Sequence, residues 1–189
     1  MLQNLGRLAH LQGDPRRAVA RFAECLPLFR AAGDAWGTGM ALQFHAGELA
    51  RRGDAAARPM TEEALTVHRR AGDHHAAAIA QRVLARLLAN EGDLAGARTL
   101  FEESLPVLRE MGDKPNLVVA LIGLGRLDLD GGDPVAARAR FAEALRITQG
   151  YGQVGNHAGA LEGLAGVAAA VAPAHALRLA GAAARLRAA

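Results

Sequence analysis

Two short stretches contain residue types that cofactor or metal binding would require. Residues 150–155, Gly-Tyr-Gly-Gln-Val-Gly, match the G-x-G-x-x-G pattern of dinucleotide-binding loops. Such a loop needs a preceding strand and an acidic residue about 20 positions later. A helical pattern precedes this stretch, so we predict a turn between helices. Residues 128–133 resemble the start of a calcium loop, but Asp133 and Ala139 stand where that loop needs Gly and Glu. We predict a helix end and a helix cap there.

Histidine and cysteine form no recognisable site. His74 and His75 are adjacent, and neighbouring side chains diverge by about 100° around a helix, whereas metal ligands must converge. We therefore predict solvated histidines at this turn, together with His68 just before it. Cys25 falls at a small-residue position without a catalytic partner, which predicts a buried, inert thiol. The sequence thus predicts no catalytic residue, no metal site and no cofactor, and we expect a protein that is not an enzyme.

The composition limits the fold class and the kinds of partner. Of 189 residues, 44 are Ala and 22 are Gly, while aromatic residues make up 4%, which disfavours β-sheets and favours closely packed helices. The net charge of +3 is spread along the chain, so we expect no direct nucleic-acid binding. One cysteine excludes an internal disulfide framework. Since there is no long apolar run and no secretory signal, we expect a soluble cytoplasmic protein.

Gly-Asp pairs divide the chain at a constant interval, apart from one interval that is a single position shorter. Gly readily adopts the left-handed conformation that ends a helix, and Asp accepts hydrogen bonds from the free N–H groups of the next helix. The pairs are Gly13-Asp14, Gly33-Asp34, Gly53-Asp54, Gly72-Asp73, Gly92-Asp93, Gly112-Asp113 and Gly132-Asp133. They predict helices at residues 1–12, 15–31, 35–51, 55–71, 75–91, 94–110, 115–131, 134–149, 155–171 and 173–188.

The segments alternate between two patterns, which we name A and B helices. B helices carry a small residue, an aromatic residue and another small residue on one face, as in Ala97, Phe101 and Ser104. A helices carry a small residue seven positions before their final Gly, which lets the Phe of a B helix approach. The repeating unit therefore comprises one A and one B helix, about 40 residues in all. We predict one domain of five helix pairs, approximately residues 1–34, 35–73, 74–113, 114–152 and 153–189.

This pattern resembles the tetratricopeptide repeat (TPR) superfamily, whose signature places Leu-Gly in helix A, Gly before helix B, and then Ala, Phe and Ala. Two stretches match it: Leu5-Gly6, Gly13, Ala18, Phe22 and Cys25, and Leu124-Gly125, Gly132, Ala137, Phe141 and Ala144. The resemblance implies an all-α fold, a right-handed α-solenoid of about five two-helix TPR-like repeats. The period departs from the family, because the usual TPR unit has about 34 residues.

A looser resemblance concerns the ends of two B helices and the end of the chain. Residues 22–34, 101–113 and 176–186 are similar to segments of the helical-repeat sensor region of MalT/AfsR-like STAND transcriptional regulators. The resemblance implies the sensor or interaction part of a bacterial signalling or transcriptional regulator. The sequence contains neither a phosphate-binding loop nor an obvious helix-turn-helix. We therefore expect a fragment of such a regulator, or a product shorter than its relatives.

Two rows of polar residues follow the A helices, which line the concave face of TPR-like solenoids. They lie six and ten positions before the Gly that ends each A helix, and their separation of four positions places them on one helical face. Arg suits carboxylates and phosphates. The alternative is that neighbouring acids, such as Glu48 or Asp128, neutralise these arginines. The predicted ligand-binding residues are Gln3, Arg7, Gln43, Arg82, Arg86 and Arg126.

The leading functional hypothesis is therefore a non-catalytic binding module. Its partner would be a protein or peptide, acidic in character, or an anionic small effector. The alternative is a self-association or assembly scaffold, such as a homodimer, without a dedicated ligand. Neither hypothesis includes a membrane contact.

Overall fold

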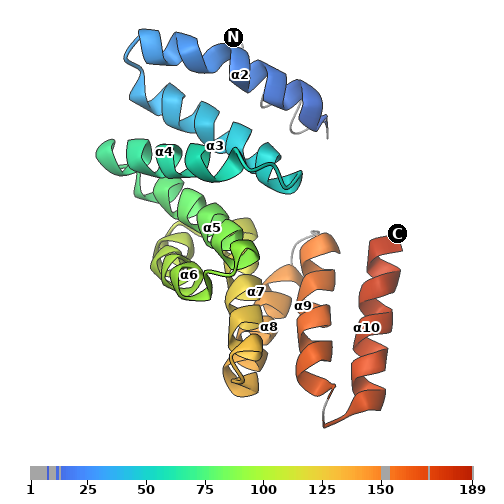
Figure 1. The fold of residues 1–189 in the computed structure, drawn as a ribbon. Helices are drawn as coiled ribbons and strands as arrows, with labels where there is room; N and C mark the ends of the chain where they lie inside the picture. The colour runs from blue at the N-terminus through green and yellow to red at the C-terminus, as the bar shows by residue number, and fades with distance from the viewer. Residues whose placement is uncertain (1–7, 9–11, 13, 150–153, 170, 189) are drawn as a thin grey trace. The chain divides into compact units, whose positions relative to one another are not determined.

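The computed structural model describes residues 8, 12, 14–149, 154–169 and 171–188, and all regular structure in this part of the chain is α-helical (Figure 1). The predicted all-α class is confirmed. Most of the predicted helix at 1–12 (residues 1–7 and 9–11), and residues 150–153 of the G-x-G-x-x-G motif, lie outside the described residues. Of the helices that the structure describes, none is long and apolar enough to cross a membrane.

The chain divides into two compact units, Met1–Gly92 and Asp93–Ala189. The helix bounds agree with the predicted ranges to within three residues. Unit 1 contains α2 (Pro15–Ala31), α3 (Ala35–Arg51), α4 (Ala57–Arg70) and α5 (His74–Glu91). Unit 2 contains α6 (Leu94–Glu110), α7 (Lys114–Asp130), α8 (Pro134–Gln149), α9 (Val154–Ala168) and α10 (Pro173–Ala188).

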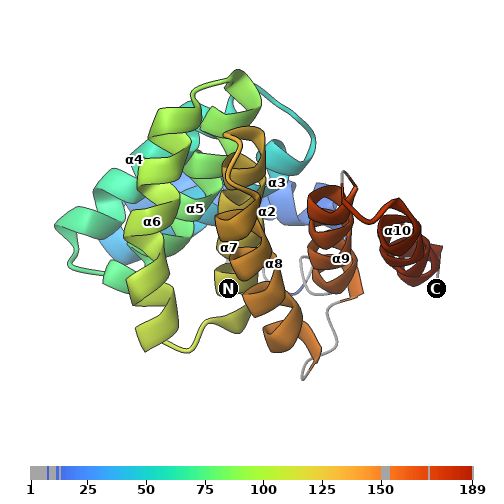
Figure 2. The same cartoon turned by 90° about the horizontal axis from the view of Figure 1, so that it is seen from below.

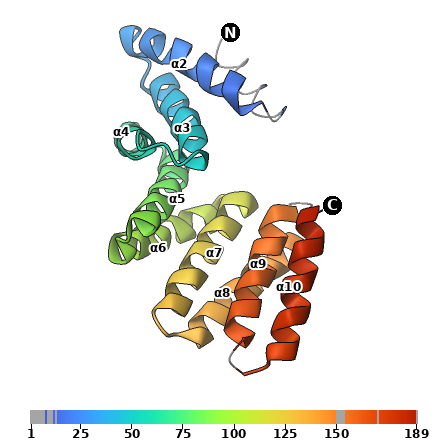
Figure 3. The same cartoon turned by 45° about the vertical axis from the view of Figure 1, so that its right-hand side comes forward.

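Within each unit, helices that follow one another in sequence pack together. Figure 2 shows α6, α7 and α8 side by side in unit 2, and Figure 3 shows α9 beside α10. The A helices also contact each other, α3 against α5 in unit 1 and α7 against α9 in unit 2. This packing of helix pairs is consistent with an α-solenoid, in which each pair buries its apolar faces against its neighbours.

The Gly-Asp pairs form the predicted joints between helices. Gly33, for example, has a φ of +66°, a left-handed conformation that Gly adopts without strain. The Asp34 N–H donates to the Phe29 carbonyl at 3.0 Å and closes α2, while the Asp34 carboxylate accepts from the Gly37 N–H at 2.8 Å and caps α3. Positive φ angles recur at Gly53, Gly72, Gly92, Gly112 and Gly132.

The start of α4 departs from the prediction. Helix α4 begins at Ala57, two residues later than expected, and its N-cap residue Ala56 provides no side-chain hydrogen bond. Asp54 accepts from the Ala56 N–H at 2.9 Å instead, and its carbonyl accepts from the Ala57 N–H at 3.0 Å. The carboxylate of Asp54 therefore stabilises a tight turn before the helix rather than the helix itself.

Small residues allow aromatic rings to fill the core, as the B-helix pattern predicts. In unit 1, Phe22 is fully buried and its ring stacks on Phe44 with centroids 5.0 Å apart. In unit 2, a Cβ added to Gly125 of α7 would lie 2.8 Å from the ring of Phe141, and one added to Gly163 of α9 would overlap the same ring. The ring of Phe141 thus packs closely against two A helices at positions where each of them has a glycine.

Cys25 lies in the small-residue position that the sequence assigned to it. Its side chain is buried beside Phe22 in the core of unit 1. Burial raises the pKa of the Cys25 thiol, which reduces the thiolate fraction at neutral pH. The predicted burial is therefore confirmed, and the raised pKa is the one expected for an unreactive thiol.

Candidate functional site

Three of the predicted ligand-binding residues lie in unit 1, on the A helices α3 and α5. Gln43 belongs to α3, and Arg82 and Arg86 belong to α5, one helical turn apart. All three side chains are half-buried. Because α3 and α5 contact each other, these residues belong to one local surface, which we call the A-helix face of unit 1. It also includes Gly47, at the α3 position equivalent to Arg86.

Arg86 is the most unusual residue of the A-helix face. Its Nε is buried without a hydrogen-bond acceptor, and no described acidic side chain forms an ion pair with it. Burial, and then the positive charge of nearby Arg51, lower the pKa of Arg86. A guanidinium in this position has given up water without gaining a counter-ion. A bound anion would supply both the missing acceptor and the missing charge.

Gln43 and Gly47 complete the A-helix face on the side of α3. The Gln43 Oε1 is buried without a donor among the described residues, so this face presents an unused acceptor as well as an unused donor. A Cβ built on Gly47 meets nothing within 4 Å, so there is open space at the position where other A helices carry Arg. A peptide backbone, which offers both N–H and C=O groups, has the complementary chemistry.

The remaining predicted residues do not belong to this local surface. Arg126 lies on α7 in unit 2, where it is exposed. The pKa of Glu162 on α9 is lowered mainly by its hydrogen bond to Arg187, with a smaller contribution from the charge of Arg126. Gln3 and Arg7 lie outside the described residues. Among the predicted residues that the structure describes, Gln43, Arg82 and Arg86 thus lie on two helices that contact each other, and their role in binding stays a prediction.

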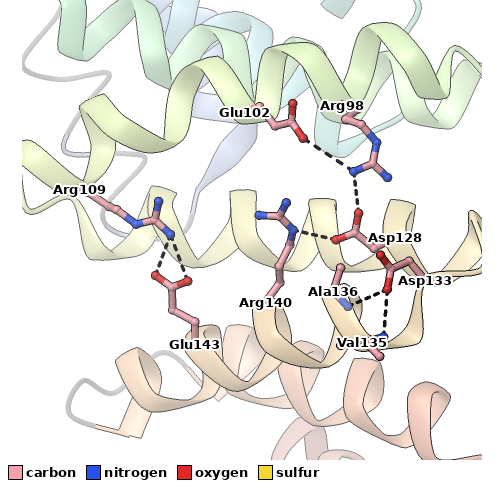
Figure 4. A network of polar contacts seen from close by, with 9 residues as sticks. All are labelled: Arg98, Glu102, Arg109, Asp128, Asp133, Val135, Ala136, Arg140 and Glu143. Atoms are coloured by element: carbon pink, nitrogen blue, oxygen red, sulfur yellow. Dashed lines mark hydrogen bonds and ion pairs between the residues drawn. The ribbon is translucent and has the colours of Figure 1, made fainter.

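Each acid named as an alternative partner of the arginine rows forms an ion pair with at least one arginine outside those rows. Glu48 is buried and pairs with Arg51, from its own helix. Asp128 is also buried, and Figure 4 shows it between two B helices: it accepts from Arg98 of α6 at 2.6 Å and from Arg140 of α8 at 2.7 Å. Asp128 thus ties α6 and α8 to α7 and does not neutralise Arg126 by an ion pair.

His68 corrects one prediction, because it is not solvated. Its side chain is 1% exposed on α4, and its ring lies against the backbone of α3, so that a Cβ at Gly39 would be 2.6 Å from the His68 Cε1. Burial lowers the pKa of His68, while Asp73 and a hydrogen bond to the Gly39 backbone oppose that effect. The Nε2 is buried without a partner, so protonating this ring would place an uncompensated charge in the core.

We therefore expect unit 1 to lose stability on acidification. The pKa of His68 is lower in the folded chain than its ordinary value of 6.5. Below that pH the unfolded chain binds a proton that the folded chain does not, which favours unfolding. Replacing His68 with Leu should reduce the loss of stability between about pH 7 and pH 5, measured by urea unfolding at each pH. The exposed His74, replaced with Gln, is the control; an undiminished loss in His68→Leu would contradict this account.

His45 of α3 should also make the folded chain less stable at low pH. Burial lowers its pKa, against a smaller opposing effect of Asp54. Some acid sensitivity should therefore remain in His68→Leu, and it should fall further when His45 is also replaced.

The A-helix face is suited to binding and not to proton transfer. Guanidinium groups stay protonated at neutral pH and only donate hydrogen bonds. Across the described residues, no three His, Cys, Asp or Glu side chains are placed to hold a metal ion. The structure also contains a cavity in unit 2, lined by α8, α9 and α10, which the sequence analysis did not identify. The sequence signal that indicates this cavity is a difference between equivalent residues of successive repeats.

Comparisons with known proteins agree with this architecture. Residues 85–150 match the tetratricopeptide repeat family. The crystal structure of BtubC (BKLC) from P. vanneervenii is similar with a TM-score of 0.75 at 22% identity, over 99% of this chain and 78% of that one. A protein described as a kinesin light chain of Podosopora anserina, with nearly identical TPR-like repeats, gives 0.67 at 15% identity, over 99% and 93%. A variant of that protein gives 0.69. No curated protein sequence matches the chain.

These similarities establish a TPR-like repeat fold. Repeats of this kind generally mediate protein–protein interactions, and such folds are generally non-catalytic scaffolds. The family match begins in α5 and extends through α8. It therefore includes Arg86 and Arg126 but neither Gln43 nor Arg82.

Proposed function

We propose that this chain is a non-catalytic recognition module whose A-helix face in unit 1 binds an acidic peptide segment of a partner protein. Arg86 is the residue on which the proposal depends most. Gln43 and Arg82 flank it, and the TPR-like fold supports a protein partner over other classes of ligand. An anionic small effector fits this face less completely than an acidic peptide. It supplies the negative charge for Arg86 but not the N–H donor that would satisfy Gln43.

The observation that carries the proposal is the pair of unused buried groups on this face. The Nε of Arg86 lacks an acceptor and the Oε1 of Gln43 lacks a donor. Leaving such groups unsatisfied costs about 1–3 kcal/mol each, and stable proteins satisfy most of them. A peptide with a carboxylate near an N–H group would satisfy both groups at once. This gives binding energy and a preference for acidic sequences.

We further propose that the module serves as the sensor or interaction part of a bacterial regulator. The support is the similarity of residues 22–34, 101–113 and 176–186 to STAND-type regulators. On this view, occupancy of the A-helix face passes to other modules of the regulator. Screening full-length relatives for an ATP-binding module next to this repeat region would test the assignment, and its consistent absence would contradict it.

Gly47 offers a sharp test of peptide binding. Glu at this position would place a carboxylate in the same row as Arg86, and Gln is a neutral control of equal size. The Cβ of either side chain should fit, because beyond the adjacent backbone of α3 it would meet no atom within 4 Å. Both should raise helix stability by about 0.5–1 kcal/mol relative to Gly. Peptides selected from a random library against the native chain serve as probes, with binding measured by fluorescence anisotropy.

We expect Gly47→Glu to weaken the binding of selected acidic peptides at least about tenfold more than Gly47→Gln. Equal weakening by both variants would mean that the face binds peptides without selecting for charge. Unchanged binding by both would mean that the peptide does not use this face. Either outcome contradicts the proposal.

A further inference from the structure

A cavity of about 410 Å³ lies in unit 2. It is lined by residues of the B helices α8 and α10, of the A helix α9, and of the turn between α9 and α10. Its polar groups are Arg138 of α8 and His175 of α10. The volume is within the range of small-molecule sites, which are mostly apolar with a few polar groups. The remaining walls are apolar and come from Ala142, Leu164, Val167, Ala168, Val171 and Leu179.

The preceding repeat has charged residues in the equivalent place. There, Arg98 binds Asp128 at 2.6 Å and Glu102 at 3.8 Å, and Arg140 binds Asp128 from the other side (Figure 4). Two further residues, Arg109 and Glu143, join α6 to α8 at 2.9 Å. Salt bridges therefore link these two B helices, both directly and through Asp128 of α7.

The glycines fix the equivalence between the two repeats. Gly123 and Gly163 lie one repeat apart, and each faces the ring of the preceding B-helix Phe, Phe101 or Phe141. By the same spacing, Arg138 corresponds to Arg98. Equivalent residues of α8 and α10 are separated by one position fewer, because α8 begins at Pro134 and α10 begins at Pro173.

In the last repeat, the arginine remains but its partners are missing. Ala142 stands in the place of Glu102, and Ala168 in the place of Asp128. Leu179 takes the place of Arg140. All three replacements line the cavity. Arg138 has no ion pair with any residue that the structure describes, so a single positive charge lies at the edge of an apolar space that a carboxylate occupies in the neighbouring repeat.

We propose that this cavity binds a small carboxylate with an apolar tail. The carboxylate would occupy the place of the Asp128 side chain and accept hydrogen bonds from Arg138, with His175 as a second polar contact. The tail would cover Leu164, Val167 and Leu179. This site is separate from the A-helix face of unit 1, and its ligand is a free small molecule because the cavity is too small for a helix, whose diameter is about 10 Å.

Octanoate is a suitable probe because it combines one carboxylate with a short alkyl chain. Octan-1-ol has the same chain without the charge, and octylammonium has the opposite charge. N-acetylaspartate amide represents an acidic side chain of a protein. We expect octanoate to bind the native chain with a dissociation constant of about millimolar and to shift the methyl NMR signals of Leu164, Val167 and Leu179. The other three probes should bind more weakly.

Two pairs of variants separate the role of the charge from an effect on folding. Arg138→Gln should weaken octanoate binding about tenfold or more, whereas Arg178→Gln, on the exposed surface of α10, should leave it unchanged. Ala168→Asp restores the missing acid and should abolish binding while Arg138 remains. Ala168→Asn has the same shape without the charge and should retain binding.

Three results would overturn the proposal: no octanoate binding, equal affinity in Arg138→Gln and the native chain, or methyl shifts confined to other parts of the protein. Binding of N-acetylaspartate amide as tight as that of octanoate would also overturn it, since it would assign the site to a protein side chain. Amide NMR spectra of each variant establish that it is folded, so that a loss of binding refers to the cavity alone.

Discussion

Replacing Phe141 with Ala is expected to lower the free energy of unfolding by about 3–5 kcal/mol. The ring is fully buried, and it packs against Gly125 of α7 and Gly163 of α9. The cost of a large-to-small substitution depends on how well the surroundings can collapse into the space. Here two of the neighbours are glycines, which have no side chain that could move into the cavity.

The measurement is urea unfolding followed by circular dichroism, with Val135→Ala as the control. Val135 lies on the same helix and is 79% exposed, so its truncation should change stability by less than about 0.5 kcal/mol. A change of less than about 1 kcal/mol in Phe141→Ala would contradict the core position of the ring. Hydrogen exchange should localise the loss to α7, α8 and α9, because repeat proteins can lose stability locally.

The helices and the aromatic core could be predicted because local chemistry determines them. Gly-Asp pairs mark helix ends through backbone conformation and capping, and both effects act within a few residues. The small residue at Gly125 indicated a close approach of the Phe ring, and the structure confirms it. These features repeat along the chain, so each copy supports the interpretation of the others.

Two errors have a common cause in the spacing of the repeats. The second repeat of the pattern is one residue short, and that shift places His68 at the core position that Leu108 occupies in the next B helix. Applying the shift to His68 would have predicted its burial. The same shortening places Asp54 in a tight turn instead of at a helix cap. A neutral histidine is compact enough to occupy such a core position. The residue type alone does not indicate whether a histidine is buried or exposed.

The charged residues could not be paired from the sequence because their partners come from different helices. Asp128 is bound by Arg98 and Arg140, which are 30 residues before it and 12 residues after it. From the sequence alone, Asp128 is an alternative partner for the neighbouring arginines of the two rows. Comparing equivalent positions of successive repeats would have detected that Arg138 lacks the acids that surround Arg98.

Charge reversal at Arg86 is expected to abolish the binding of acidic peptides. The Arg86 Nε is buried without an acceptor, so a ligand carboxylate there would form a desolvated, charge-assisted hydrogen bond. Losing such a contact costs about 2–5 kcal/mol, and most of the loss appears in the dissociation rate. This corresponds to at least about a 30-fold loss of affinity. Reversal of the exposed Arg126 should cost about 1 kcal/mol or less.

The most direct test of the recognition surface compares the affinity of one selected acidic peptide for the native chain, Arg86→Glu and Arg16→Glu. Arg16 is exposed on α2, so both variants carry the same change in net charge, and circular dichroism checks their helicity. We expect Arg16→Glu to bind like the native chain and Arg86→Glu to lose binding at unchanged helicity. Equal affinity of the native chain and Arg86→Glu would contradict the assignment of the A-helix face as the binding surface.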